Sequence, residues 1–186
     1  TSTNDLSYLD ELGLTPGSFI LGMCRFVPEK NLHHLISAFS ELKQNDIKLV
    51  LAGDADFHDN YYKQLVKQAQ EAGVILTGFV KGHKLNSLLS HCRTYCLPSS
   101  HEGLPIALLE AMSYGANVIV SDIPANKEVN LPAECYFQCG NVEQLSNKLF
   151  EAINTPYSRT NDDMTHYNWE TIANQTQSVY NACIDP

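Results

Sequence analysis

Short apolar runs alternate with amphipathic stretches along most of the chain. Six runs have the apolar character of strands, and most consist of consecutive apolar residues: residues 18–24, 47–53, 74–79, 94–98, 117–122 and 135–138. Consecutive apolar residues are typical of strands that are buried on both faces of a sheet. The pattern therefore predicts about six strands that lie inside the protein.

Helical patterns fill the intervals between these runs. The first, over residues 32–44, places its apolar residues on one stripe, with Asn31 as the expected N-cap. Three more cover residues 59–73, 83–92 and 142–154. Residues 156–186 contain no strand pattern and predict two helices, the second over about 169–182.

Regular alternation of strands and helices predicts the fold class. It implies βαβ units with right-handed crossovers, and so an α/β, Rossmann-like parallel sheet of about six strands with helices on both faces. A length of 186 residues suits one domain over 1–186. Ligands of such sheets bind outside the carboxyl ends of the strands. The loops that follow the strands are therefore the candidate binding segments: residues 25–30, 53–59, 79–83, 99–105 and 122–126.

Common nucleotide and hydrolase motifs are absent from these loops. No GxGxxG follows the first strand, which disfavours a standard NAD site, and no GxxxxGK[ST] indicates a P-loop. HExxH and GxSxG are also missing. The loop after the first strand instead holds two cations, Arg25 and Lys30, which could neutralise a diphosphate without a metal. A solvated, charged turn explains the same two residues equally well.

The loop after the fourth strand, PSSHEGLP, leads into a strongly apolar helix that looks fully buried. Gly103 permits close approach of a ligand to the backbone, and Pro105 suits the first helical turn. The N–H groups of Gly103, Leu104 and Ile106 would then point at an anion, helped by the helix dipole. This loop is a second candidate element for diphosphate binding.

Two carboxylates flank that apolar stretch. Glu102 precedes it and Glu110 lies within it, eight residues later, about 12 Å along a helix. Both could accept hydrogen bonds from the hydroxyl groups of an elongated ligand, such as a sugar and a ribose. Two alternatives remain open: Glu102 stabilises the helix dipole, and Glu110 pairs with a buried Lys or Arg.

Composition narrows the choice of partners. The net charge of −9 disfavours nucleic acid and anionic membranes, and no apolar run is long enough to span a bilayer. The start of the chain lacks the features of a signal peptide, and it lacks an initiator Met, which indicates a fragment or a processed form.

Six cysteines include two CxxxC pairs, Cys92/Cys96 and Cys135/Cys139, in apolar segments that look like strands. Reduced, packed thiols are the favoured interpretation, and a zinc site is the alternative.

The motifs together resemble those of a known enzyme family. Residues 98–122 resemble the E-x7-E signature of retaining glycosyltransferases with the GT-B fold, in the group often called family 4, with Glu102 and Glu110 on its two acids. Residues 19–31 resemble the Arg and Lys loop of the same family. Four further segments match in order: residues 47–54, 74–82, 121–129 and the closing helix at 168–180. The resemblance covers roughly residues 17 to 183.

The resemblance implies a role for each candidate residue. Arg25, Lys30 and Glu102 would be the catalytic residues: the two cations hold the diphosphate of a nucleotide-sugar, and Glu102 contacts the transferred sugar. Glu110 would bind the ribose, and the remaining donor-binding residues would hold the diphosphate through backbone amides and the base through backbone groups: Gly103, Leu104, Pro105, Ile106, Phe79 and Val80. The resemblance implies no cofactor and no metal. Transfer would retain the anomeric configuration by a front-face displacement.

Two local departures from the family pattern are visible, Cys24 in place of Gly and GDADFHD in place of a Gly-rich turn. The larger departure is length, because a GT-B enzyme has two Rossmann-like halves. We therefore expect this chain to be the donor-binding half, inactive alone, with the acceptor domain absent. A cytoplasmic location is expected, with the full enzyme at the inner membrane face as one option. Two alternatives remain: another GT-B enzyme such as a nucleotide-sugar epimerase, or a non-catalytic α/β binding module.

Overall fold

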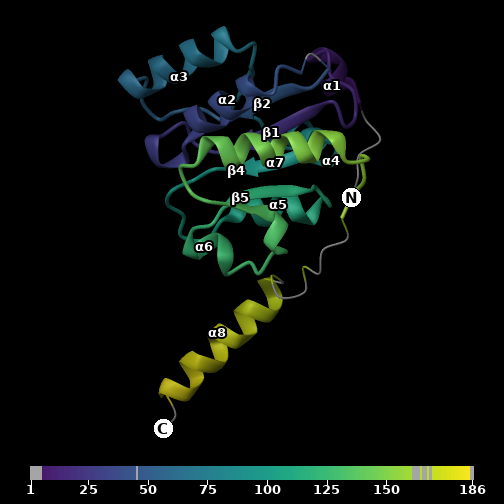
Figure 1. The fold of residues 1–186 in the computed structure, drawn as a ribbon. Coiled ribbons are helices and arrows are strands. Elements are labelled where there is room, and N and C mark those ends of the chain that lie inside the picture. The colour runs from purple at the N-terminus through teal and green to yellow at the C-terminus, as the bar shows by residue number, and fades with distance from the viewer. Residues whose placement is uncertain (1–5, 45, 161–163, 165–166, 168, 185–186) are drawn as a thin grey trace.

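Six parallel strands form one central sheet (Figure 1). The computed structural model describes residues 6–44, 46–160, 164, 167 and 169–184. The strands are β1 (Phe19–Met23), β2 (Lys48–Ala52), β3 (Ile75–Gly78), β4 (Thr94–Leu97), β5 (Val118–Ser121) and β6 (Tyr136–Phe137). Every strand pairing is parallel. The predicted Rossmann-like α/β sheet is confirmed.

The order of the strands indicates where a ligand-binding crevice forms at the sheet. It runs β3-β2-β1-β4-β5-β6, so the direction of winding reverses between β1 and β4. The loops that leave neighbouring strands at such a reversal diverge to opposite faces and leave a crevice at the carboxyl ends. The loops after β1 and β4 are the two that border this crevice.

Helices cover both faces of the sheet. The helices of the described residues are α1 (Ser7–Glu11), α2 (Leu32–Glu41), α3 (Asn60–Glu71), α4 (His83–His91), α5 (Ile106–Ser113), α6 (Pro124–Lys127), α7 (Val142–Asn154) and α8 (Trp169–Ile184), with short 3-10 turns η1 (Pro28–Lys30) and η2 (Ala133–Cys135). One apolar core joins the sheet to α1, α4 and α5, and a second joins the opposite face to α2, α3 and α7. In β1, Phe19 and Leu21 point into the first core and Ile20 into the second. This two-sided burial is the physical reason for the continuous apolar runs.

Helix ends follow the sequence signals, with one correction. The Asp59 side chain caps α3 by accepting from the Tyr62 N–H at 2.9 Å, and Gly73 ends the same segment with a left-handed φ of 67°. Asn31 does precede α2, but its side chain makes no capping bond. It is buried and donates instead to the Pro98 carbonyl at 3.2 Å, in the loop after β4. Asn31 therefore links the loop after β1 to the loop after β4 and does not cap α2 with its side chain.

The cysteine pairs do not lie within strands as expected. Cys92 directly follows α4 while Cys96 lies in β4, and Cys135 closes η2 while Cys139 follows β6. All six cysteines are free thiols. Among the residues that the structure describes, no group of three or more His, Cys, Asp or Glu side chains could hold a metal ion.

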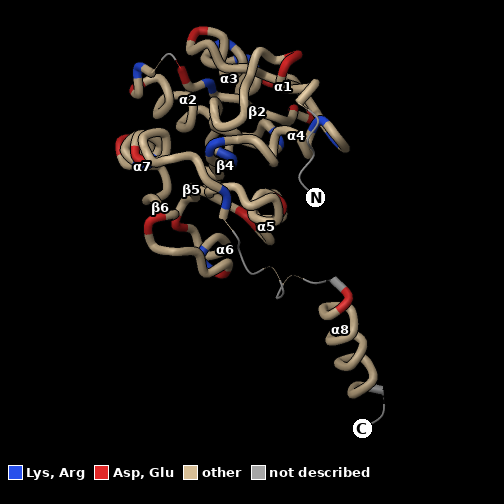
Figure 2. Tube along the Cα trace, turned by 90° about the vertical axis from the view of Figure 1, so that its right-hand side faces the viewer, with Lys and Arg blue, Asp and Glu red and all other residues tan. Residues whose placement is uncertain are grey.

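The last helix, α8, projects away from the body of the domain (Figure 1). Glu170 is its only charged residue (Figure 2). Val179 and Tyr180 on the same helix are exposed. The other helix expected after residue 156 falls partly outside the described residues, and residues 156–160 form no helix. None of the helices in the described part of the chain has the length and apolar character needed to cross a membrane.

Candidate functional site

The loops after β1 and β4 are bound to each other across the crevice. Ser100 donates from its backbone N–H to the Glu29 carbonyl at 2.8 Å, and from its hydroxyl to the same oxygen at 3.2 Å. In the opposite direction, the Asn31 side-chain amide, after β1, donates a hydrogen bond to the Pro98 carbonyl, after β4. These bonds join segments about seventy residues apart in the sequence and fix the relative position of the candidate residues they carry.

A buried ion pair lies between the same two loops. The Lys30 ammonium is 2.8 Å from Glu102 Oε1, and the two side chains are only 14% and 11% exposed. The same oxygen accepts a 2.6 Å hydrogen bond from the Ser99 hydroxyl. Because an uncompensated charge in such a place is costly, each partner holds the other where it is. Neither interpretation of Glu102 from the sequence included this pairing.

Arg25 lies on the same loop as Lys30 but in a different environment. Its Nη1 is 3.4 Å from Asp56 Oδ2, and both side chains are about two-thirds exposed, at 65% and 67%. The sequence grouped the two cations together. The structure separates them into one buried anchor and one exposed, weakly held guanidinium.

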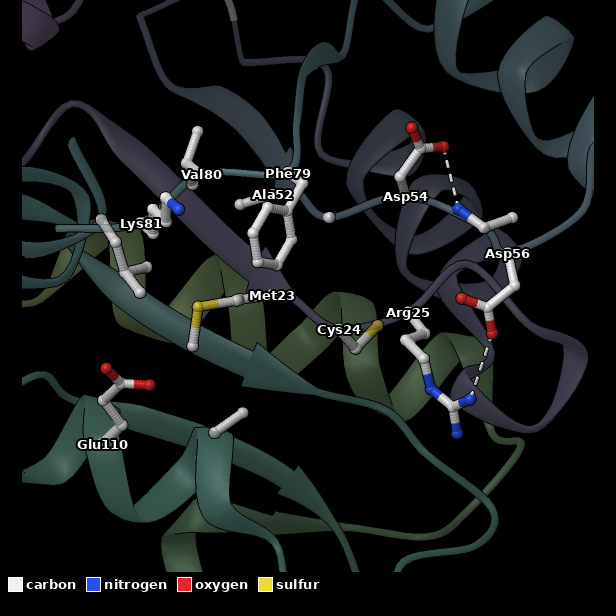
Figure 3. A pocket seen from close by; sticks show the side chains of 14 residues that line it. Met23, Cys24, Arg25, Ala52, Asp54, Asp56, Phe79, Val80, Lys81 and Glu110 are labelled. Carbon is white, nitrogen blue, oxygen red and sulfur yellow. Dashed lines mark hydrogen bonds and ion pairs between the residues drawn. The ribbon is translucent and has the colours of Figure 1, made fainter.

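A cavity of about 560 Å³ opens at the carboxyl end of the sheet, beside Arg25 (Figure 3). Its lining comes from the ends of β1, β2 and β3 and from α4 and α5, and comprises Met23, Cys24, Arg25, Ala52, Gly53, Asp54, Ala55, Asp56, Phe79, Val80, Lys81, Leu85, Ala107 and Glu110. Phe79 is 78% exposed, so its ring is open to any ligand that enters. This volume falls in the range of small-molecule sites.

Glu110 stands on the α5 wall of this cavity. Among the described residues, no hydrogen bond or ion pair reaches its carboxylate, so the expected alternative of a buried Lys or Arg partner is wrong. Burial raises the pKa of the carboxyl group. Glu110 also borders a second hollow of about 490 Å³, on the α5 face where Leu104 and Ile106 lie. It is therefore a carboxylate free to accept hydrogen bonds from a ligand.

The start of α5 differs from the expectation in two respects. Leu104 and Ile106 are 52% and 59% exposed, so the apolar helix is not fully buried. The Ile106 N–H donates to the Leu104 carbonyl at 2.8 Å, so it is not free for an anion. Within the described structure, the N–H groups of Gly103 and Leu104 make no such bond. A Cβ at Gly103 would meet nothing within 4 Å, so the packing of the protein itself does not require glycine there.

The structure brings some of the predicted residues together and separates others. Arg25, Phe79, Val80 and Glu110 share the first cavity, whereas the Lys30–Glu102 pair lies between the loops. Several cavity residues are not among those predicted from the sequence, and most of them come from the loop after β2 and the end of β1: Met23, Cys24, Asp54, Asp56, Lys81 and Leu85. The loop at residues 53–59 was among the candidate segments, but nothing in its sequence indicated which side chains face the cavity.

Buried or closely packed groups fix the backbone at the ends of β1 and β2, where it lines this cavity. The fully buried Tyr95 donates from its hydroxyl to the Met23 carbonyl at 3.1 Å. Burial raises the pKa of the Cys24 thiol to about 12, so that thiol stays protonated and unreactive at neutral pH. Gly53, with a φ of 135°, is required because a Cβ there would lie 1.9 Å from the Cys24 carbonyl oxygen.

Comparison with known proteins gives one consistent result. Residues 11–170 match the family described as glycosyl transferases group 1. An uncharacterized glycosyltransferase of Bacillus subtilis, YqgM, is 36% identical over 118 residues, which are 60% of this chain and 33% of that protein. The chain thus spans about a third of the length of this relative.

Solved structures agree. The catalytic domain of cholesterol-alpha-glucosyltransferase from Helicobacter pylori matches with a TM-score of 0.65 and 30% identity, over 75% of this chain and 87% of that one. The Anabaena protein HepE, solved in complex with UDP and glucose, shares the fold with a TM-score of 0.74 and 24% identity, over 83% of this chain and 44% of that one.

Proposed function

The chain belongs to the glycosyl transferases group 1 family, and on this premise we propose that it is the donor-binding half of an enzyme that moves a sugar from a nucleotide-sugar to an acceptor in glycan synthesis. One observation carries the proposal. The cavity at the carboxyl end of the sheet has an exposed guanidinium, Arg25, at one side and the carboxylate of Glu110, which has no partner among the described residues, at the other. An anionic group and a polyol are the ligand parts that these two side chains bind best.

A nucleoside diphosphate fits this arrangement of groups. Arg25 binds the diphosphate, together with the N–H groups of Gly103 and Leu104 just before α5, which make no hydrogen bond within the described part of the chain. Glu110 accepts hydrogen bonds from the ribose hydroxyls. Phe79 and Val80, at the end of β3, hold the base between the exposed ring and the backbone.

Glu102 is assigned to the transferred sugar. Its Oε1 is taken by Lys30 and Ser99, whereas no hydrogen bond or ion pair to Oε2 is present among the described residues. That second oxygen can accept a hydrogen bond from a sugar hydroxyl while the first anchors the side chain. Lys30 then orients Glu102 and adds positive charge near the leaving diphosphate.

We propose transfer with retention of configuration and without a metal. The bond between the anomeric carbon and the diphosphate oxygen breaks, and the acceptor oxygen bonds to the same face of that carbon. The acceptor proton passes to the departing diphosphate oxygen. The largest contribution of this chain is then to stabilise the negative charge that develops on the diphosphate, through Arg25, Lys30 and the amides before α5.

We further propose that an acceptor-binding half completes the enzyme. The chain spans 33% of the Bacillus subtilis relative and 44% of the HepE chain, so each has room for another domain. On this proposal the chain binds the donor by itself but transfers little sugar. Restoring an N-terminal half should produce transferase activity, whereas an epimerase would interconvert nucleotide-sugars and a non-catalytic module would do neither.

A thermal-shift panel with UDP, GDP, ADP and their sugar conjugates tests donor binding. A ligand at about one hundred times its Kd adds roughly 2.7 kcal/mol, which for a domain of this size is a rise of roughly 5 to 10 °C in Tm. We expect one base to stand out. A flat panel with both nucleotides and conjugates would contradict the proposal.

A further inference from the structure

Backbone contacts hold the loop after β2 against the loop that carries Arg25. The Phe26 N–H donates to the Asp54 carbonyl at 2.8 Å, and the Cys24 N–H donates to the Ala52 carbonyl at 3.2 Å. The close approach of Gly53 to the Cys24 carbonyl leaves no room for a side chain between the two segments. Asp56 is therefore kept beside Arg25 by the fold and not only by the attraction of the two charges.

The Arg25 side chain is turned toward Asp56 and away from Glu110 (Figure 3). One hydrogen bond of 3.4 Å joins Nη1 to Asp56 Oδ2, and both side chains are mostly exposed. Exposed pairs of this kind are weak, because water screens the attraction. A diphosphate offers a guanidinium two parallel, shorter hydrogen bonds, so it can displace the carboxylate.

Charge in the cavity makes this pairing consequential. Its lining carries two cations, Arg25 and Lys81, against three carboxylates, Asp54, Asp56 and Glu110. Asp54 is engaged elsewhere, with its own loop at the Ala55 N–H, 2.8 Å away, and with His58 at 3.6 Å. Asp56 is thus the carboxylate that neutralises the cation expected to bind the diphosphate.

We propose that Asp56 competes with the donor diphosphate for Arg25, and so sets how tightly the site holds the nucleotide and how fast it releases the nucleoside diphosphate product. This inference rests on the proposed function. When the ligand enters, the guanidinium exchanges the single bond to Asp56 for the bonds to phosphate. When the sugar has left, Asp56 takes Arg25 back and lowers the barrier to product release.

Three charge-removing variants of the 186-residue chain test this competition. Asp56→Asn removes the competing charge beside Arg25. Asp54→Asn removes a negative charge from the same cavity, but Asp54 does not pair with Arg25. Glu71→Gln removes one from a remote pair with Lys67 that is equally exposed, at 77% and 69%. Calorimetry gives the Kd of each variant for UDP, GDP and ADP, and stopped-flow displacement gives the dissociation rate.

We expect Asp56→Asn to bind the preferred nucleoside diphosphate about two- to fivefold tighter, with a matching fall in dissociation rate. Asp54→Asn should change the Kd less, and Glu71→Gln not at all. An equal fall in Kd for Asp54→Asn and Asp56→Asn would mean that any carboxylate in the cavity repels the diphosphate. That result would overturn the proposal that Asp56 competes for Arg25. Weaker binding by Asp56→Asn would mean that Asp56 positions Arg25 for the ligand, which also overturns it. If wild type and all variants bind no nucleotide, the proposed function itself fails.

Discussion

Glu102 and Glu110 have the same side chain, lie eight residues apart and occupy opposite environments. The Glu102 side chain is largely buried, with Lys30 at 2.8 Å and Ser99 at 2.6 Å on one oxygen. Glu110 lines an open cavity, and its pKa is raised by burial without a compensating cation. Glu102 contributes to the stability of the protein through its pairing with Lys30 and Ser99. The charged form of Glu110 instead lowers the stability of the folded protein, and a ligand that donates hydrogen bonds to the carboxylate would offset this cost.

The largest expected effect is on folding. Lys30→Ala leaves the Glu102 charge without its partner between two loops, so we expect the free energy of unfolding to fall by about 3 kcal/mol. For a domain of this size that is a drop of roughly 6 to 12 °C in Tm. Lys67→Ala, which breaks an exposed pair, should cost less than about 0.5 kcal/mol. Similar losses in both variants would show that the Lys30–Glu102 pair is no anchor.

Arg25→Ala should have the largest effect on binding while leaving Tm unchanged, because the side chain is exposed. Loss of charge-assisted hydrogen bonds to phosphate weakens binding by roughly ten- to a hundredfold. Calorimetry with a nucleoside diphosphate measures the loss, and the matching nucleoside, which has no phosphate, serves as the control ligand. Equal weakening of both ligands would place the diphosphate away from Arg25.

Glu110→Gln should weaken nucleoside diphosphates by about three- to tenfold, since an amide is a poorer acceptor for the ribose hydroxyls than a carboxylate. Free sugar phosphate lacks the ribose and should bind as it does to wild type. Competition titrations against one fluorescent nucleotide compare the two ligands directly. If sugar phosphate is the ligand that weakens, the assignments of Glu102 and Glu110 are reversed.

The smallest effect is a pH dependence of stability. Because the pKa of Glu110 is raised in the folded state, ionisation costs more there than in the unfolded chain, where the pKa is about 4.3. Below that pH the group is protonated in both states and the penalty is absent. As pH rises through the folded pKa, wild type should lose stability relative to Glu110→Gln. Urea unfolding of both proteins at pH 4 and pH 7 measures the change, and the opposite sign would mean that a cation faces Glu110.

Strands could be predicted from the sequence for a specific reason. A strand buried on both faces must be apolar at every position, as β1 is, and such runs are visible without any knowledge of their neighbours. The helix periods and the stop at Gly73 are equally local signals.

Pairings across the crevice could not be predicted, because they depend on strand order. Lys30 and Glu102 meet only because β1 lies beside β4, and Arg25 meets Asp56 only because β2 lies on the other side of β1. The same long-range contact turns Asn31 from a helix cap into a tie between loops. Sequence patterns identified which residues carry chemistry, and packing determined which of them are engaged with each other.

One measurement addresses the contrast between the two carboxylates directly: the Tm of Glu102→Gln and Glu110→Gln, each with and without the nucleoside diphosphate that wild type binds best. We expect Glu102→Gln to melt well below wild type and still to rise when nucleotide is added. Glu110→Gln should melt at or slightly above wild type and show a reduced rise. The reverse pattern, with Glu110 needed for folding and Glu102 for nucleotide binding, would contradict the account.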